Sequence, residues 1–413
     1  MKPKRLWSPV FTIPLTLAAI VLSIGSTASA APQYKVLHAF GAGNDGATVW
    51  GGLVRDSKGH LYGTTAGGGA YTYGSVFELT PDSGGKWTEQ VLHSFQNNGS
   101  DGTEPSSTLI LDGVGNLYGT TPDGANRHCT YGCGVVFELT PHPSGWSEAV
   151  LYRFPLPRGG CCPYAGVIRD AAGNLYGTAG YPFELSPGSH GWEEKVLSRF
   201  PGTDNGSEPF AGLVMDPSGS LYGTTQLGGG SPNCGGGCGT VFQVTPEPDG
   251  KWKEHILHRF GSSGDGAFPG VGSLVLDKLG NVYGTTDIGG PSRYGTVFKL
   301  TPQTNGGWKE AILYSFTDGS DGGYASAGVV IDNTGNLYGT TFAGGDPNCG
   351  CGVVYKLAPG TKGKWTYTVL HTFIGSDGAQ PDANLILDDK GNLYGTTAIG
   401  GAAGAGVAFE LTP

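Results

Sequence analysis

Aspartate residues recur beside glycine in the segments that connect one repeat of this sequence to the next. An example is the run Asp101-Gly102-Thr103-Glu104-Pro105. The equivalent aspartates are Asp45, Asp101, Asp204, Asp265, Asp321 and Asp377. Carboxylates beside Gly-rich loops supply the oxygen ligands that calcium requires, and they also accept hydrogen bonds from sugar hydroxyls. The simpler interpretation, which the sixfold recurrence favours, is that each carboxylate accepts hydrogen bonds from the backbone of its own loop.

Eight cysteines stand outside the repeated phrases, in the connecting segments. They are Cys129, Cys133, Cys161, Cys162, Cys234, Cys238, Cys349 and Cys351. An even number of cysteines predicts disulfides if the chain is exported. The simplest pairs are local, 129 with 133 and 234 with 238; the alternative joins 129 and 133 to 161 and 162. Zinc is less favoured, because the paired C-x2-C spacing of structural zinc sites is not present.

Four short β-type runs, each occurring seven times, must position these residues. The phrase Leu-Tyr-Gly-Thr-Thr, or a close variant, begins at Leu61, Leu117, Leu175, Leu221, Val282, Leu337 and Leu393. A short apolar run that ends in aspartate precedes it, as in Leu109-Ile110-Leu111-Asp112. A run of the type Val-Phe-Glu-Leu-Thr-Pro and a run of the type Val-Leu-His-Ser-Phe follow it. Seven sets of four strands at a period near 55 residues predict an all-β, seven-bladed β-propeller of four-stranded antiparallel blades.

The aspartate at the end of the first run predicts a tight turn. Asp112 is followed by Gly113-Val114-Gly115-Asn116 and then by the second run. Asp opens such turns and Gly adopts the positive φ that they need, so the first two runs form a hairpin. The recurrent histidines His38, His93, His258 and His371 alternate with Tyr and Ser at one position, which predicts packing rather than metal binding. The recurrent Trp residues are expected to pack between blades.

The two ends of the chain complement each other. Residues 34–40 form a fourth-type run with no preceding three, whereas residues 407–413 form a third-type run with no fourth to follow. We therefore expect the N-terminal strand to complete the last blade and so to close the ring. In the opposing interpretation the Phe-ending run is the innermost strand of each blade, so that complete four-stranded modules follow one another from residue 36 to residue 413. Short third-to-fourth connections favour the shared blade.

The third repeat departs from the pattern. Its Leu-Tyr-Gly-Thr phrase begins at Leu175, only 46 residues before the next such phrase at Leu221. The run Thr178-Ala179-Gly180-Tyr181-Pro182 replaces the long Gly-rich loop. A shortened loop predicts a notch in the rim that carries the connecting segments. Arg127, His128 and Arg158 lie in the loops beside that notch and form a candidate polar cluster for ligand binding.

The pattern Asp-x-x-Gly-Asn-Leu-Tyr-Gly-Thr-Thr, followed by a Gly-rich loop and Gly-x-Val-Phe-Glu-Leu-Thr-Pro, resembles the GloVer tandem repeat of exported bacterial proteins. The resemblance extends over residues 31–413. The same hairpin is similar, more loosely, to the NHL-type propeller blade. The resemblance implies export and adds no reaction.

Residues 1–30 have the features of a signal peptide. Lys2, Lys4 and Arg5 precede an apolar run from Val10 to Ile24, and Ala28-Ser29-Ala30 supplies a small-residue cleavage site. The formal charge is −10, and it becomes −13 without those three basic residues, which argues against nucleic acid and anionic membranes as partners. We expect a secreted or periplasmic monomer with no membrane span after cleavage.

Composition excludes several other classes. The 76 Gly and 27 Pro among 413 residues oppose a helical protein, and Gly lacks the three-residue period of collagen. The sequence contains no nucleophile elbow, metal-ligand motif or clear acid–base pair. We therefore predict a binding module for an extracellular glycan or protein, with no defined catalytic activity and no cofactor other than possible calcium. The alternative is an extracellular polysaccharide lyase or hydrolase with an active site on the rim.

Overall fold

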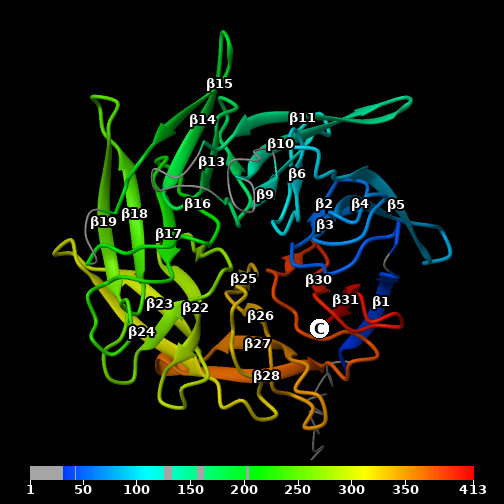
Figure 1. Cartoon of the computed structure of the whole chain (residues 1–413). Helices are drawn as coiled ribbons and strands as arrows, with labels where there is room; N and C mark the ends of the chain where they lie inside the picture. Colours follow the sequence, from blue (N-terminus) through cyan, green and yellow to red (C-terminus); the bar gives the residue numbers. More distant parts are fainter. Residues whose placement is uncertain (1–30, 42, 125–132, 156–161, 201–203) are drawn as a thin grey trace, which may run out of the picture. The chain divides into compact units, whose positions relative to one another are not determined.

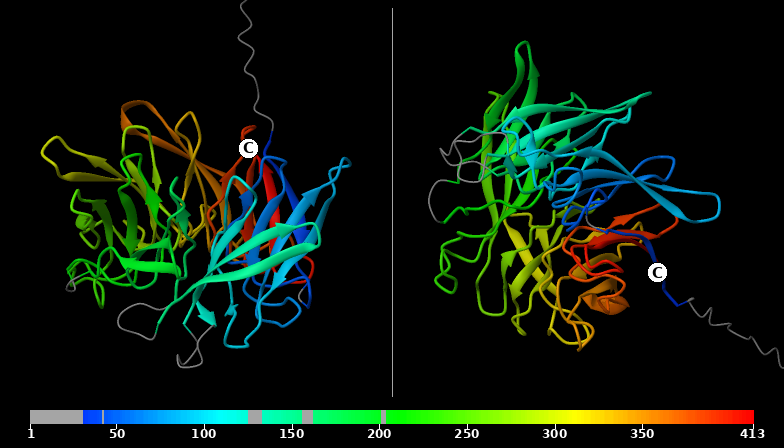
Figure 2. Two further views of the ribbon diagram at one scale, coloured as in Figure 1. Left: turned by 90° about the horizontal axis from the view of Figure 1, so that it is seen from above. Right: turned by 45° about the vertical axis from the view of Figure 1, so that its right-hand side comes forward.

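The structure is a computed structural model that describes residues 31–41, 43–124, 133–155, 162–200 and 204–413. Residues 32–413 form one compact unit, in which seven small antiparallel sheets stand around a common axis (Figure 1). Figure 2 shows the outer hairpins of these sheets projecting away from the ring. The architecture confirms the predicted seven-bladed β-propeller.

Each blade has a short inner strand and a long outer strand. From the axis outward, the strands are β2 (Val54–Arg55), β3 (Leu61–Thr65), β4 (Ser75–Pro81) and β5 (Trp87–Ser94) in blade 1; β7 (Ile110–Leu111), β8 (Leu117–Thr121), β10 (Val135–His142) and β11 (Gly145–Arg153) in blade 2; β12 (Ile168–Arg169), β13 (Leu175–Thr178), β14 (Pro182–Gly188) and β15 (Gly191–Val196) in blade 3; β16 (Val214–Met215), β17 (Leu221–Thr225), β18 (Thr240–Pro246) and β19 (Trp252–Arg259) in blade 4. They are β21 (Val275–Leu276), β22 (Val282–Gly289), β23 (Thr296–Pro302) and β24 (Trp308–Ser315) in blade 5; β25 (Val330–Ile331), β26 (Leu337–Thr341), β27 (Val353–Pro359) and β28 (Trp365–Thr372) in blade 6; and β29 (Ile386–Leu387), β30 (Leu393–Thr397), β31 (Val407–Thr412) and β1 (Gln33–Ala39) in blade 7.

Three minor strands and one short turn complete the described elements. β6 (Gly102–Thr103) pairs with β9 (Asp123–Gly124), and β20 (Gly266–Pro269) pairs with β22. A 3-10 turn, η1 (Thr361–Gly363), precedes β28. Within the described ranges there is no α-helix, and no helix there is long and apolar enough to cross a bilayer.

The N-terminal strand closes the ring, as predicted. β1 pairs antiparallel with β31, with Tyr34 opposite Leu411. Phe40, at the end of β1, is fully buried, and its ring lies 4.9 Å from that of Phe77 in blade 1. The closing strand therefore contributes to the cores of the last and the first blade, and β31 has no free edge.

The aspartates that end the inner strands form the predicted turns. In blade 2, Asp112 Oδ1 accepts hydrogen bonds from the backbone N–H groups of Val114, Gly115 and Asn116 at 2.9–3.0 Å. Its Oδ2 accepts one from the Tyr118 hydroxyl at 3.2 Å. The Tyr-to-Asp bond recurs in all seven blades, so these aspartates stabilise the hairpins.

The glycine of Leu-Tyr-Gly-Thr-Thr is required by close packing. A Cβ on Gly119 would lie 2.5 Å from the ring of Phe137, which faces it on the neighbouring strand. The other six blades repeat this arrangement, with a Phe or Tyr ring 2.5–2.7 Å from the position of the absent Cβ. The glycine therefore allows the aromatic ring to fill the core of each blade.

Two contacts join successive blades. The Tyr of one blade meets the Trp of the next edge-on, as between Tyr62 and Trp146 with ring centroids 6.3 Å apart, which confirms the predicted role of the Trp residues. A threonine hydroxyl also donates to the backbone at the start of the next inner strand. Thr396 in blade 7 donates to the Gly51 carbonyl in blade 1 at 3.0 Å, and this bond completes the ring.

Two disulfides lie in loops between second and third strands. Cys234–Cys238, one of the predicted local pairs, lies between β17 and β18, and Cys349–Cys351 lies between β26 and β27. Cys133 is disulfide-bonded as well, but Cys129 and Cys161 fall outside the described residues, so the pairing among 129, 133, 161 and 162 stays a prediction. The disulfides indicate an oxidising compartment.

Candidate functional site

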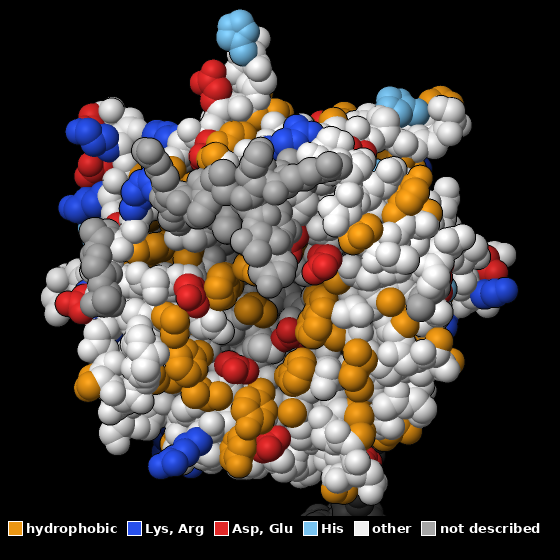
Figure 3. Space-filling view, in the orientation of Figure 1, with side chains coloured by type: hydrophobic (Ala, Val, Ile, Leu, Met, Phe, Trp, Pro, Cys, Tyr) orange, Lys and Arg blue, Asp and Glu red, His pale blue; other side chains and the backbone are white. Residues whose placement is uncertain are grey.

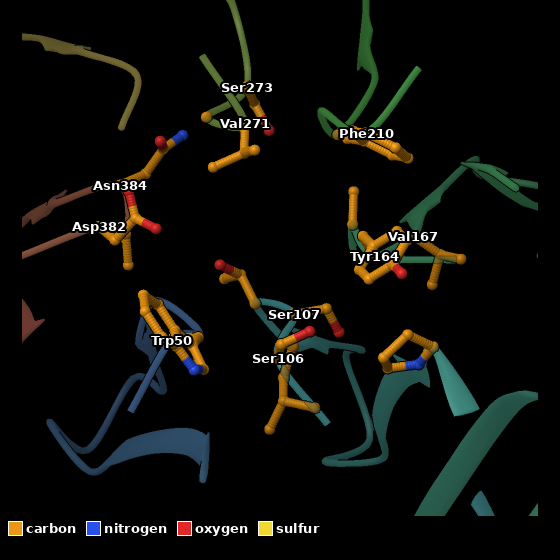
Figure 4. A pocket seen from close by; sticks show the side chains of 18 of the residues that line it. Trp50, Ser106, Ser107, Tyr164, Val167, Phe210, Val271, Ser273, Asp382 and Asn384 are labelled. Carbon is orange, nitrogen blue, oxygen red and sulfur yellow. The ribbon is translucent and has the colours of Figure 1, made fainter. Parts of the chain in front are cut away.

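A pocket of about 530 Å³ opens at the axis of the propeller, on the rim that carries the loops between blades (Figure 4). This rim also carries the loops between second and third strands, because the two kinds of loop pair through bridges such as Ala47–Gly67 and Ser207–Leu227. The sharing of one rim confirms the predicted topology. The pocket volume is typical of sites for small ligands.

One position in the repeat supplies most of the large side chains in the pocket. It lies six residues before the turn aspartate, where the chain enters the inner strand of each blade. Its occupants are Trp50, Ser106, Tyr164, Phe210, Val271, Ser326 and Asp382. All except Ser326 line the pocket, and Ser326 donates a hydrogen bond to Asp382 Oδ1. The propeller thus places seven equivalent positions around the axis. Their side chains differ from blade to blade, although the sequences of the strands recur.

The two sides of the pocket differ in their side chains: one is aromatic, and the other combines an aromatic ring with polar groups. In Figure 4, Tyr164 and Phe210 lie on one side, and Trp50, Asp382 and Asn384 lie on the other. The rings of Tyr164 and Phe210 meet edge-to-face, with centroids 5.1 Å apart. Tyr164 is 46% exposed, although aromatic side chains of this size are usually buried. Its ring is therefore part of the exposed lining of the pocket.

Carboxylates supply the charge of the pocket. Asp382, Glu104 and Asp123 line it, and its described lining contains no Lys, Arg or His. Burial, together with Asp287 nearby, raises the pKa of Asp382 to about 6 against a hydrogen bond from Ser326 that lowers it. Burial and the neighbouring Glu104 raise the pKa of Asp123 to about 6. Figure 3 shows acidic and hydrophobic side chains around the central hollow, with the Lys and Arg side chains farther out.

The loop aspartates that the sequence singles out lie between blades, each in its own loop. Asp101 accepts hydrogen bonds from the N–H groups of Gln96 and Gly102 at 2.9 and 2.8 Å. Asp45, Asp265, Asp321 and Asp377 also accept backbone N–H bonds from their own loops. At Asp204 the backbone carbonyl accepts a bond from the Arg259 side chain. These contacts agree with the loop-stabilising interpretation, and ligand binding by Asp101, Asp204, Asp265, Asp321 and Asp377 stays a prediction.

The recurrent histidines contact these same aspartates at the blade interfaces. His38, His258 and His371 lie 2.9–3.2 Å from Asp45, Asp265 and Asp377. Where tyrosine replaces histidine, Tyr314 donates to Asp321 at 2.9 Å. The next blade adds a third residue to each contact. It is a glutamate at His258, where Glu310 approaches the imidazole, and a tyrosine at His371, where the Tyr34 ring stacks on the imidazole with centroids 3.8 Å apart. One structural role is thus filled by alternative residue pairs, as expected for packing between blades.

Two of these interfaces have the residue types of a metal site. His93, Asp101 and Glu148 form one cluster, and His258, Asp265 and Glu310 form another, each with ligand atoms within 4.8 Å of one another. The two aspartates already accept backbone N–H bonds, and each cluster includes an imidazole, unlike the all-oxygen sites of calcium. The clusters therefore do not match the predicted calcium ligands, and calcium stays an untested prediction.

Glu310 makes stability depend on pH at one of these interfaces. Burial, together with Asp265, raises its pKa to about 7 against the attraction of His258. The folded protein then binds this proton more tightly than the unfolded chain, so the stabilisation is complete below pH about 4.5 and is lost as the pH rises through about 7. Burial and Asp45 raise the pKa of Glu89 to about 7 at another interface, with the same sign.

We therefore expect the wild-type melting temperature to be lower at pH 8 than at pH 5. Glu310→Gln cannot ionise, so its melting temperature should fall roughly 1–3 °C less than that of the wild type between these pH values. Thermal unfolding followed by circular dichroism measures the difference. Glu247→Gln, on an exposed hairpin, is the matched control and should behave as the wild type. If the melting temperatures of Glu310→Gln and wild type changed equally with pH, the raised pKa of Glu310 would be contradicted.

The remaining candidate cluster cannot be placed. Arg127, His128 and Arg158 lie outside the described residues. The shortened turn of blade 3 is present, with the Ala179 N–H bonded to the Tyr181 carbonyl at 2.9 Å. The notch predicted from it stays a prediction, because the loops beside it are not described.

Sequence reasoning missed Trp50, Tyr164, Phe210 and Asp382. The sequence signals were recurring residues, cysteines and the irregular third repeat, whereas the large side chains of the pocket come from a position at which the repeats differ. Aligning the seven copies on their turn aspartates would have revealed that position. Its location at the axis depends on the fold.

Comparison with known proteins agrees with the repeat pattern. The model of the Gloeobacter/Verrucomicrobia repeat matches residues 24–188, 179–350 and 305–413. The chain belongs to this family. The family is the one that the resemblance to the GloVer repeat indicates. No curated protein matches this Gloeobacter/Verrucomicrobia repeat protein.

Solved structures are also similar to the Gloeobacter/Verrucomicrobia repeat protein, at 9–15% sequence identity. An ancestral GH74 enzyme has a TM-score of 0.58 and 11% identity over 89% of this chain, which spans 48% of that enzyme. A luciferin-regenerating enzyme has a TM-score of 0.46 and 15% identity, with 92% of this chain and 95% of that one covered. A protein of unknown function from Dyadobacter fermentans has a TM-score of 0.45 and 9% identity, with 93% and 99% covered.

Proposed function

We propose that the protein is an exported, monomeric glycan-binding module whose axial pocket holds a short segment of an oligosaccharide. The observation that carries this proposal is the single variable position that gives the pocket Trp50, Tyr164, Phe210 and Asp382. Sugars present an apolar C–H face and a ring of hydroxyls. Aromatic rings pack against such a face, and carboxylates, serines and amides accept and donate the hydroxyl hydrogen bonds.

The size and shape of the site favour a glycan over a folded protein partner. A pocket of about 530 Å³ lies within the range for small-molecule sites. A stable protein partner would instead bury a surface of about 800 Å² on each side. Polar side chains, which include Ser106, Ser107 and Asn384, also line the pocket (Figure 4).

The test is titration calorimetry of the intact protein with a panel of neutral tetrasaccharides. We expect at least one to bind with a dissociation constant of about 10 µM to 1 mM. Tyr164→Ala/Phe210→Ala should weaken that binding at least about tenfold, because two apolar surfaces are lost. Tyr71→Ala is the matched control, since Tyr71 is 50% exposed but does not line the pocket. Binding that the double variant leaves unchanged would refute the pocket as the site.

Catalysis at the same pocket is the second candidate function. A polysaccharide hydrolase uses a carboxyl group with a raised pKa as its general acid, and a lyase needs a base that removes a proton. Asp382 and Asp123 both have pKa values raised to about 6 by burial. Products released from an oligosaccharide, and their loss with Asp382→Asn, would favour the enzyme. Binding without product favours the module.

A further inference from the structure

The charge of the axial pocket restricts which glycan it accepts. Its described lining carries three carboxylates, Glu104, Asp123 and Asp382, without a Lys, Arg or His to balance them. Asp382 is partly shielded from water between blades 6 and 7, where it accepts a hydrogen bond from the Ser326 hydroxyl. Glu104 is exposed, whereas Asp123 and Asp382 are half-buried, and burying a carboxylate without a cation costs free energy. A cationic ligand would offset this unfavourable free energy, whereas an anionic ligand would increase it.

The aromatic residues point to the same class of ligand. Trp50 and Asp382 lie on the same side of the pocket, and Tyr164 and Phe210 lie on the opposite side (Figure 4). Faces of Trp and Tyr attract ammonium groups through their negative quadrupole, most strongly when water is displaced. A carboxylate and an aromatic side chain on one side of a pocket can therefore bind an ammonium group together, and the aromatic side chains opposite are left for a sugar ring.

We propose that the pocket selects oligosaccharides that carry a free amino group, that is, amino sugars that are not acetylated. The proposal rests on the proposed glycan-binding function and names its ligand class. The ammonium group lies between Asp382 and Trp50, and the sugar ring packs toward Tyr164 and Phe210. An acetylated amino sugar keeps the ring and the hydroxyls but loses the charge, so it is the closest control ligand.

The experiment is calorimetric titration of the intact protein at pH 7 and low salt. The probes are glucosamine tetramer, N-acetylglucosamine tetramer, cellotetraose, galacturonic acid tetramer and choline. We expect glucosamine tetramer to bind about tenfold tighter than the acetylated and neutral tetramers, as one ion pair in a partly closed site allows. Galacturonic acid tetramer should bind weakest, and choline should bind more weakly than glucosamine tetramer.

A matched pair of variants separates local charge from overall charge. Asp382→Asn keeps the shape of the side chain and should reduce the preference for glucosamine tetramer to about twofold or less. Asp249→Asn removes the same charge from an exposed hairpin, where Asp249 pairs with Lys251, and should leave the preference unchanged.

Each other outcome has a defined meaning. Equal affinity for the glucosamine and acetylated tetramers would overturn the amino-sugar proposal and leave glycan binding intact. Tightest binding of the acidic tetramer would overturn it as well. Choline binding as tight as that of glucosamine tetramer would show an ammonium site without sugar recognition and would also overturn it. Absence of binding to every saccharide would instead refute the proposed function itself.

Discussion

Trp50→Ala is expected to reduce the affinity for the bound oligosaccharide about 30-fold. Trp50 is the largest side chain at the variable position, and it lies next to Asp382 in the pocket (Figure 4). Loss of an aromatic anchor from the centre of a site typically costs about 2 kcal/mol, which corresponds to this factor. Calorimetric titration of the variant with the tightest tetrasaccharide measures the loss.

Two controls make the Trp50 result specific. Trp50→Phe keeps an aromatic face and should lose less than about fivefold in affinity. The melting temperature of Trp50→Ala should stay within about 2 °C of the wild type, because the side chain is only partly buried. Retention of full affinity by a folded Trp50→Ala protein would show that the ligand binds elsewhere.

Removal of the closing strand, residues 33–39, is expected to lower the melting temperature by about 10 °C or more. The deletion removes the buried Leu37, the Tyr34 ring stacked on His371 and the ladder to β31. Together these losses cost about 5 kcal/mol or more. The bared edge of β31 would also pair with other chains, so size-exclusion chromatography should show oligomers or aggregates.

Addition of the missing strand in trans tests whether closure is the cause. A synthetic peptide of residues 33–39 supplies β1, and it should restore both the melting temperature and the monomeric elution volume in proportion to its concentration. A peptide in which Leu37 is replaced by Asp should fail, because Leu37 is buried. A deletion variant that melts as the wild type would contradict the closure of the ring by this strand.

The fold was predictable because every blade repeats the same local signals. Three residues of each blade are fixed by contacts within a few residues or with the adjacent strand. They are the turn aspartate, the glycine that faces Phe137 or its equivalent, and the proline that ends the third strand. Asp112 and Gly119 show this directly. The unpaired strands at the two chain ends then specified the closure between β1 and β31.

The pocket was not predictable in the same way, because it depends on positions that lie far apart in the sequence. Trp50 and Asp382 are brought together only when β1 closes the ring, and Tyr164 faces them across the axis (Figure 4). The recurrence of the loop aspartates suggested a ligand site, yet the Asp101 carboxylate accepts hydrogen bonds from the backbone of its own loop. The residues that we propose for ligand binding instead occupy a position whose side chain differs from repeat to repeat.

A crystal structure of the protein with glucosamine tetramer decides whether the axial pocket binds amino sugars. We expect electron density for a sugar ring in the axial pocket, packed against Tyr164 or Phe210, with its amino group within hydrogen-bond distance of Asp382. Density for the ligand on the outer hairpins or between blades, with the axial pocket filled by water alone, would contradict this expectation.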